Sequence, residues 1–240
     1  MALAQTTIRP VAVEDAAALR AAMHGAHVVI SVPPSSSGCP AHELVSDHAQ
    51  SARSITYLST TGVYGDLGGG WAMEWTTPNP QSVRAERRLQ AEDAWRQSFP
   101  DLKIARLPGI YGPGRSAFDR LRSGRARRIV KARQVFSRIH VDDIARGLHA
   151  MINANVTGVF HICDDEAAPP QDVIAYAAEL LDISAPPEIS FEAADLSDMA
   201  RSFYSECKRV SNARLKAATG WRPLYSTYRT GLETILSEET

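Results

Sequence analysis

The sequence predicts an α/β protein in which helices cover a parallel β-sheet. Short apolar runs alternate with helical patterns along most of the 240 residues. This alternation is typical of strands that are connected by helices. Several apolar runs are rich in β-branched residues and stop at proline or glycine, as buried strands do.

The apolar runs predict five strands. They are Ile8–Val13, His27–Val32, Ile55–Ser59, Leu102–Leu107 and Val159–Cys163. The β-branched run from His27 stops at Pro33 and is typical of a strand that is buried on both faces. We expect Ile55–Ser59 and Lys103–Leu107 to lie side by side near the centre of the sheet. Their ends, Thr60 and Pro108, should then share one rim with Ser31 to Pro33.

Helical periodicity predicts five helices between and after these strands. They are Asp15–Met23, Ala41–Arg53, Ser82–Ser98, Pro170–Leu181 and Thr227–Leu236. From about Pro186 the alternation is lost and the sequence becomes rich in turns, which indicates a second, smaller lobe. We therefore expect a nucleotide-binding domain over residues 1–165, with 112–138 contributing to the second lobe, and that lobe mostly over residues 166–240.

Composition excludes several classes of protein. The net charge is −1, so no field over the whole protein attracts nucleic acid or a membrane. Cys39, Cys163 and Cys207 are scattered, which argues against a disulfide framework and a metal site and favours a reducing compartment. Neither a signal peptide nor an apolar run approaching the ~20 residues of a membrane span is found. We expect a soluble cytoplasmic protein with no metal, nucleic-acid or membrane partner.

Four segments in a fixed order carry a resemblance to a known family. They are Tyr57–Asp66 (YLSTTGVYGD), Arg106–Gly114 (RLPGIYGPG), Ile139–Ala145 (IHVDDIA) and Asn212–Pro223 (NARLKAATGWRP). Together they resemble the extended branch of the short-chain dehydrogenase/reductase superfamily, which includes nucleotide-sugar epimerases and dehydratases. The resemblance implies a Rossmann-type doubly wound parallel sheet with a small C-terminal lobe on the substrate side. It also implies NAD or NADP as cofactor and a small-molecule substrate.

The resemblance places the catalytic hydroxyl on Thr60, four residues before Tyr64. A hydroxyl there fits the chemistry, because open α/β sheets bind ligands at the carboxyl ends of their strands. The alternative is that Thr60 only caps the strand. We interpret Tyr64 as a packing residue beneath the site, and the run Gly68–Gly70 as a flexible loop, because it does not follow a Gly-x-Gly-x-x-Gly pattern.

The same resemblance implies a set of cofactor-binding residues. The stretch from Pro108 to Tyr111 resembles the backbone that contacts the nicotinamide carboxamide, although a simple strand-to-loop turn is an alternative. The full expected set is Ser31, Val32, Pro33, Ser59, Arg88, Pro108, Gly109, Ile110 and Tyr111.

The charged helix departs from the family pattern, which has a Tyr-x-x-x-Lys pair there. Counting back from Glu92, which resembles the family's helix glutamate, places Arg88 at the lysine position and Arg84 at the tyrosine position. Arginine stays protonated and cannot shuttle a proton, but it can bind phosphate or carboxylate in a bidentate manner. We therefore take Arg84 and Arg88 as candidate catalytic residues. The alternative is a solvated helix face on which the arginines pair with glutamates.

The start of the chain is a second departure. The family begins with a strand, a glycine-rich turn and a helix that binds pyrophosphate, whereas the first glycine here is Gly25. Ile8–Val13 resembles the family's third strand, so we expect the first βαβ unit to be absent. This implies either a truncated chain or one that has abandoned standard dinucleotide binding, and weak binding of NAD(P) in either case.

The stretch Arg115–Arg133 carries seven arginines and one lysine in 19 residues, against a single aspartate. In the resembling enzymes this region lines the nucleotide-diphosphate part of the substrate site; a solvated basic surface is the alternative. Phe136 stands four residues before His140, where the family has arginine. We interpret His140 and Asp143 as structural, and expect Asp142 or Asp143 to cap the helix that follows.

These observations predict an NAD(P)-dependent oxidoreductase or epimerase-like enzyme that acts on a small anionic or nucleotide-linked metabolite. The alternative is a non-catalytic binding or regulatory protein that retains the fold. Arg84 and Arg88 favour the alternative, and Thr60 favours the enzyme. The resemblance also implies a homodimer that pairs the helices 41–53 and 82–98, with Leu89 and Trp95 as apolar candidates at the interface.

Overall fold

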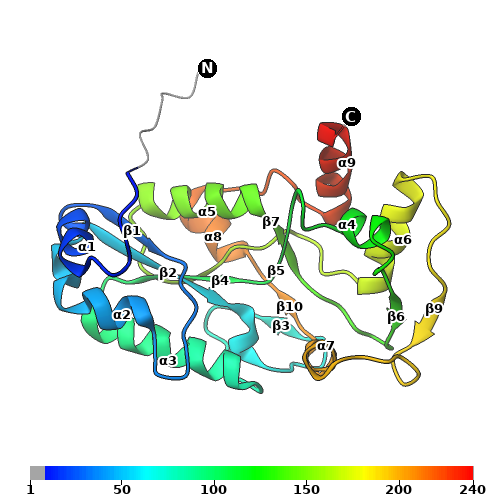
Figure 1. The fold of residues 1–240 in the computed structure, drawn as a ribbon, viewed down its shortest axis with the longest axis horizontal. Coiled ribbons are helices and arrows are strands. Elements are labelled where there is room, and N and C mark those ends of the chain that lie inside the picture. The colour runs from blue at the N-terminus through cyan, green and yellow to red at the C-terminus, as the bar shows by residue number, and fades with distance from the viewer. Residues whose placement is uncertain (1–8, 240) are drawn as a thin grey trace.

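The fold is built on a four-stranded parallel sheet whose strands are connected by helices (Figure 1). The computed structural model describes residues 9–239. The strand order is β1-β2-β4-β8, and these strands comprise His27–Ile30, Ser54–Thr60, Lys103–Leu107 and Gly158–His161. The predicted α/β class is confirmed, and β2 and β4 lie side by side at the centre as expected.

Helices cover both faces of this sheet (Figure 1). One face packs against four helices: α1 (Ala16–Met23), α2 (Pro40–Val45), the 3-10 helix η1 (Ser46–Ser51) and α3 (Val83–Ser98). The other face packs against α5 and α8, which span Val141–Asn153 and Ala213–Thr219. Successive strand residues point to opposite faces. Ile104 therefore joins the α3 side of the core, whereas Ala105 and Leu107 join the α5 side.

A second cluster of elements lies beside the carboxyl ends of the strands, at the right of Figure 1. Its helices are α4, α6, α7 and α9, spanning Ala117–Arg122, Pro170–Leu180, Asp198–Tyr204 and Tyr228–Glu239. Six short strands form three pairs. β6 (Arg128–Val130) pairs with β9 (Glu188–Ser190), and β5 (Gly109–Tyr111) pairs with β7 (Arg138–His140). The third pair is β3 (Trp71–Ala72) with β10 (Arg209–Val210). A separate apolar core joins α4, α6 and α9 around Phe118 and Tyr228.

Three elements differ from the sequence prediction. Residues 9–13 form no strand, and Ile8 lies outside the described residues; Pro10 has no amide donor for a β-ladder. β1 ends at Ile30 and is not buried on both faces: within the described chain it pairs only with β2, and Val29 is 43% exposed. The helix expected over 41–53 divides at Val45, whose φ of −137° is not helical, into α2 and η1.

Two side chains also differ from expectation. Neither Asp142 nor Asp143 is the N-cap of α5, because His140 Nδ1 accepts the backbone N–H of Asp142 at 3.2 Å. Asp143 instead accepts the backbone N–H groups of Leu224 and Tyr225 at 2.7 and 2.9 Å. Trp95 is fully buried in the core of one chain and is therefore wrong as a residue for an interface. The dimer itself stays a prediction.

Helix α9 approaches strand β5 so closely that only glycine fits at Gly231. A β-carbon there would lie 2.7 Å from Cε2 of Tyr111 and would also collide with its hydroxyl.

None of the helices within residues 9–239 is long and apolar enough to cross a membrane.

Gly231→Ala should therefore destabilise the protein, although alanine is favoured over glycine inside most helices by about 0.5–1 kcal/mol. Overpacking against a buried ring costs about 1–3 kcal/mol, so the free energy of unfolding in urea should fall by that order. Thr234→Ala, on the same helix, serves as the control and should change stability much less. A stabilised Gly231→Ala protein would show that α9 does not pack on Tyr111.

Candidate active site

The carboxyl ends of the central strands meet at one rim of the sheet. Thr60 pairs with Leu107, the residue before Pro108, and β1 ends one residue before Ser31. The structure thus brings together Thr60, Pro108 and the segment Ser31–Pro33, as the sequence predicted. Strand β5 continues directly from this rim and carries Gly109, Ile110 and Tyr111 into the neighbouring lobe.

Ser59 and Thr60 point to opposite faces of β2, so their hydroxyl groups have different partners. Ser59 Oγ is buried and donates to Glu92 Oε1 at 2.5 Å. Thr60 Oγ1 is half-buried and accepts the backbone N–H of Gly62 at 3.1 Å, which caps the 3-10 helix η2 over Thr61–Tyr64. The hydroxyl of Thr60 lies nearer to the rim, while that of Ser59 is engaged beneath it. Their catalytic and cofactor-binding roles stay predictions.

Arg88 reaches from α3 to the end of β2. Its Nη1 donates to the carbonyl oxygen of Leu58 at 2.7 Å and to the hydroxyl of Tyr57 at 3.2 Å. The structure records no partner for its Nε and Nη2 among residues 9–239, so these donors are not occupied by the protein. Arg84 lies one turn earlier on α3 and points to a different element, because its guanidinium lies 5.1 Å from the ring centroid of Phe203 in α7.

Beneath the rim lies a buried ion pair that the sequence analysis did not identify. Arg106 Nε and Nη2 donate to the two carboxylate oxygens of Glu92 at 3.0 and 2.6 Å. The side chains are 2% and 0% exposed, so the pair is removed from water. Arg96 adds a third donor to Glu92 at 3.2 Å. An arginine inside an apolar strand was the signal in the sequence, because a buried charge requires a partner.

The ion pair continues into a second set of hydrogen bonds. Arg106 Nη1 donates to the hydroxyl of Tyr64 at 2.7 Å, and that hydroxyl donates to His161 Nε2 at 2.6 Å. His161 Nδ1 lies 2.9 Å from the carbonyl oxygen of Ser211 and donates to it, which assigns the tautomer. Burial raises the pKa of Tyr64. Tyr64 is thus a packing residue below the site, as predicted. Its hydroxyl both accepts a hydrogen bond, from Arg106, and donates one, to His161.

The expected cofactor-binding residues differ in their exposure. Ser31, Val32, Pro33 and Gly109 are exposed, whereas the ring of Tyr111 is buried. The hydroxyl of Tyr111 donates to the carbonyl oxygen of Thr227 at 3.5 Å, and burial, followed by the charge of Asp164, raises its pKa. The side chain of Tyr111 therefore packs against α9 and is not free to contact a ligand.

Much of the basic stretch 115–133 is paired within its own lobe. Arg122 and Arg128 form ion pairs with Glu239 and Glu188 at 2.5 and 2.7 Å. Lys131 donates to the carbonyl oxygen of Tyr204. These contacts reduce the charge that is free to meet a ligand, and they attach α4 and β6 to α9, β9 and α7.

Comparisons with known proteins agree with this architecture. A protein of unknown function from Silicibacter pomeroyi DSS is 47% identical, with a TM-score of 0.84 over 89% of this chain and 78% of that chain. The dTDP-glucose 4,6-dehydratase of Bacillus anthracis str. Ames, solved in complex with NAD, is 17% identical, with a TM-score of 0.74 over 95% of this chain and 78% of that chain. No family model matches the chain.

A curated relative of known activity matches part of the sequence. It is the 3-diazoavenalumate denitrifying reductase of a Streptomyces species, 30% identical over 142 residues. The match covers 54% of this chain and 45% of the reductase, less than half of that protein's length.

A parallel sheet that is wound on both faces, with polar side chains gathered at its carboxyl rim, defines a Rossmann-type protein. The fold is shared with NAD-dependent epimerases and dehydratases of known structure, and it agrees with the resemblance of the sequence to the extended short-chain dehydrogenase/reductase superfamily.

The buried His161 predicts a dependence of stability on pH. Burial, and then the charges of Arg106 and Arg214, lower its pKa to about 4, from an ordinary value of 6.5. Between these values the unfolded chain binds a proton that the folded chain does not bind. Folding stability should therefore fall as the pH drops from 6.5 to 4, by at most about 1.4 kcal/mol per pH unit.

His161→Asn removes this titration, and its amide can still donate to Ser211. Urea unfolding of both proteins across this pH window should show a shallower loss of stability in the variant. Carboxylates such as Glu74, whose pKa is raised by burial, titrate in both proteins and largely cancel in the difference. Equal pH slopes in the two proteins would mean that His161 is already protonated in the fold or is not buried.

Proposed function

We propose that this protein is an NAD(P)-dependent oxidoreductase or epimerase-like enzyme that acts on a small anionic or nucleotide-linked metabolite. The observation that carries the proposal is the placement of Arg88. Its Nη1 is held by Tyr57 and by the carbonyl oxygen of Leu58, two residues before β2 ends at Thr60, and its other donors have no partner among residues 9–239. A cation that is fixed near the end of this strand suits an oxygen-rich ligand.

The roles follow from the chemistry of these groups. When bound, the nicotinamide cofactor supplies or accepts the hydride. Arg88 binds the cofactor ribose or a substrate anion, and the Thr60 hydroxyl bonds the reacting oxygen. The exposed backbone of Pro108 and Gly109 and the segment Ser31–Pro33 border the same rim. Arg84 cannot act as an acid, because a guanidinium does not release its proton at a working pH.

A non-catalytic binding protein is the second candidate. Arginines at positions 84 and 88 favour it, and so do Tyr57 and Tyr64, which are fully buried with hydroxyl groups engaged by Arg88 and Arg106. These two phenols cannot take part in proton transfer with a ligand at the rim. Consumption of NADH or NADPH with a panel of small anionic and nucleotide-linked carbonyl compounds separates the candidates. Cofactor binding without any turnover would support the binding protein.

Arg88→Ala should weaken binding of NADH or NADPH by the ~1.5–3 kcal/mol typical of a charged hydrogen bond, or about 10- to 150-fold in Kd. Thr60→Val should leave cofactor binding nearly unchanged and slow any turnover. Titration followed by tryptophan fluorescence measures the first effect. The control is Arg87→Ala on the same helix, with circular dichroism to confirm that each variant is folded. If Arg88→Ala binds the cofactor as the parent does, Arg88 does not hold the cofactor ribose.

A further inference from the structure

A cavity of about 480 Å³ lies at the amino ends of the strands, at the end of the sheet opposite the rim. It is lined by His27, Arg53, Ile152, Asn153 and Asn155. The volume is within the ~300–1,000 Å³ of small-molecule sites. Because β2 runs for seven residues at about 3.3 Å each, this cavity is about 20 Å from Thr60. Nothing in the proposed reaction uses it.

Apart from Ile152, the side chains that line the cavity are hydrogen-bonding groups, and that of Arg53 is cationic. Arg53 is exposed, and its guanidinium has no hydrogen-bond or ion-pair partner within residues 9–239. His27 Nδ1 lies 2.7 Å from the hydroxyl of Ser54, which orients the imidazole on the face of the sheet that α5 covers. Asn153 and Asn155 add amide groups, and no lining residue carries a carboxylate.

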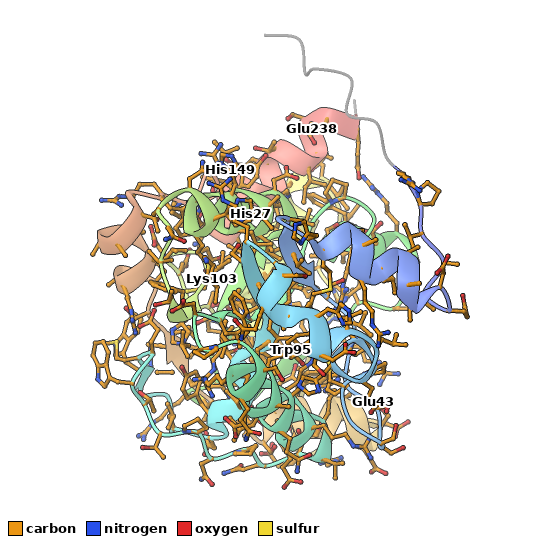
Figure 2. All side chains as sticks on the ribbon, turned by 90° about the vertical axis from the view of Figure 1, so that its left-hand side faces the viewer. His27, Glu43, Trp95, Lys103, His149 and Glu238 are labelled. Atoms are coloured by element: carbon orange, nitrogen blue, oxygen red, sulfur yellow. The ribbon has the colours of Figure 1, made fainter. Side chains whose placement is uncertain are left out.

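A second cation, Lys103, lies on the same side of the sheet. Lys103 pairs in register with Thr56 on β2, two residues after Ser54, so its side chain shares the face of Ser54 and His27. Figure 2 shows the molecule from the left-hand side of Figure 1 and labels His27 and Lys103. Lys103 is 1% exposed, and the described chain provides it with neither a hydrogen bond nor an ion pair. Burial lowers its pKa, and the charge of Asp101 opposes this shift.

Among residues 9–239, no adjoining group accepts a hydrogen bond from the side chain of Arg53 or Lys103. Thr56 Oγ1, beside Lys103, is buried without a partner. The end of α5 forms the other wall, and three carbonyl groups of its last turn each accept a backbone N–H. Ala154, Asn155 and Val156 donate their backbone N–H groups to the carbonyl oxygens of residues 150, 152 and 151. Asn155 takes a left-handed φ of 47° to do so, so these carbonyls do not compensate for Lys103.

We propose that this cavity binds the phosphate group of a small molecule. Arg53 is the main ligand, because its donors are free and its fork geometry matches a phosphate. Lys103 supplies positive charge from below, and His27, Asn153 and Asn155 supply further donors. The site is independent of the proposed reaction, and its failure would leave that proposal unaffected.

Calorimetric titration of the full chain with inorganic phosphate, at an ionic strength held constant with sodium chloride, tests the site. The parent should show saturable binding of one phosphate per chain. Arg53→Gln should weaken it at least tenfold, because it removes a charge-assisted bond and disturbs no contact within the protein. Lys103→Met should also weaken binding. Arg53→Gln keeps the test decisive if that core variant fails to fold.

Arg146→Gln is the matched control, since Arg146 is an exposed arginine nearer the other end of α5. It should bind phosphate as the parent does. A parallel titration with glycerol 3-phosphate separates free phosphate from a phosphate ester: tighter binding of the ester assigns an organic ligand, and weaker binding assigns phosphate itself. Absence of saturable binding by the parent to either probe, or equal affinity in the parent and Arg53→Gln, would overturn the proposal.

Discussion

The buried ion pair between Glu92 and Arg106 is the interaction on which the rest of this structure depends. It joins the longest helix, α3, to the central strand β4, and both side chains are almost completely removed from water. A charge in such a place is tolerated only when it is paired and its remaining hydrogen bonds are satisfied. Ser59 and Arg96 complete the set around Glu92. Glu92 and Arg106 thus satisfy each other inside the core.

The consequences of this pair reach the rim of the sheet. Through Tyr64 and His161, Arg106 connects the turn after β2 to β8 and to the segment that follows β10. The backbone around Thr60 is therefore held from below by a continuous chain of hydrogen bonds. Arg88 holds it from the side through Leu58. A rim fixed in this way can present groups to a ligand without first having to become ordered.

Several elements could be predicted from sequence because their signals are local. Ser82 caps α3, and strands such as β2 and β4 are short runs rich in β-branched or apolar residues, so their predicted bounds were close to those observed. The predictions that were wrong concerned features that depend on tertiary contacts. The exposure of Val29 follows from the position of β1 within the sheet, and the cap made by His140 follows from the packing of its ring against Tyr111 and Tyr225.

The candidate site shows the same division. Order along the chain was enough to place Thr60, Pro108 and Ser31–Pro33 at one rim, because carboxyl ends of parallel strands lie together. The order of the segments did not predict which hydroxyl lies nearer to the rim. Ser59 and Thr60 are adjacent in the sequence, and only their hydrogen-bond partners in the structure distinguish them. Lys103 escaped notice for a related reason: a lysine at the start of a strand is ordinary until its burial is known.

A double-mutant cycle on Glu92 and Arg106 tests this account most directly. The free energy of unfolding is measured for the parent, Glu92→Gln, Arg106→Gln and the double variant. We predict that each single variant loses about 3–5 kcal/mol, because it leaves an uncompensated buried charge, and that the double variant is much more stable than the sum of the losses implies, with a coupling energy of about 2 kcal/mol or more. Losses that add to within about 0.5 kcal/mol would contradict it.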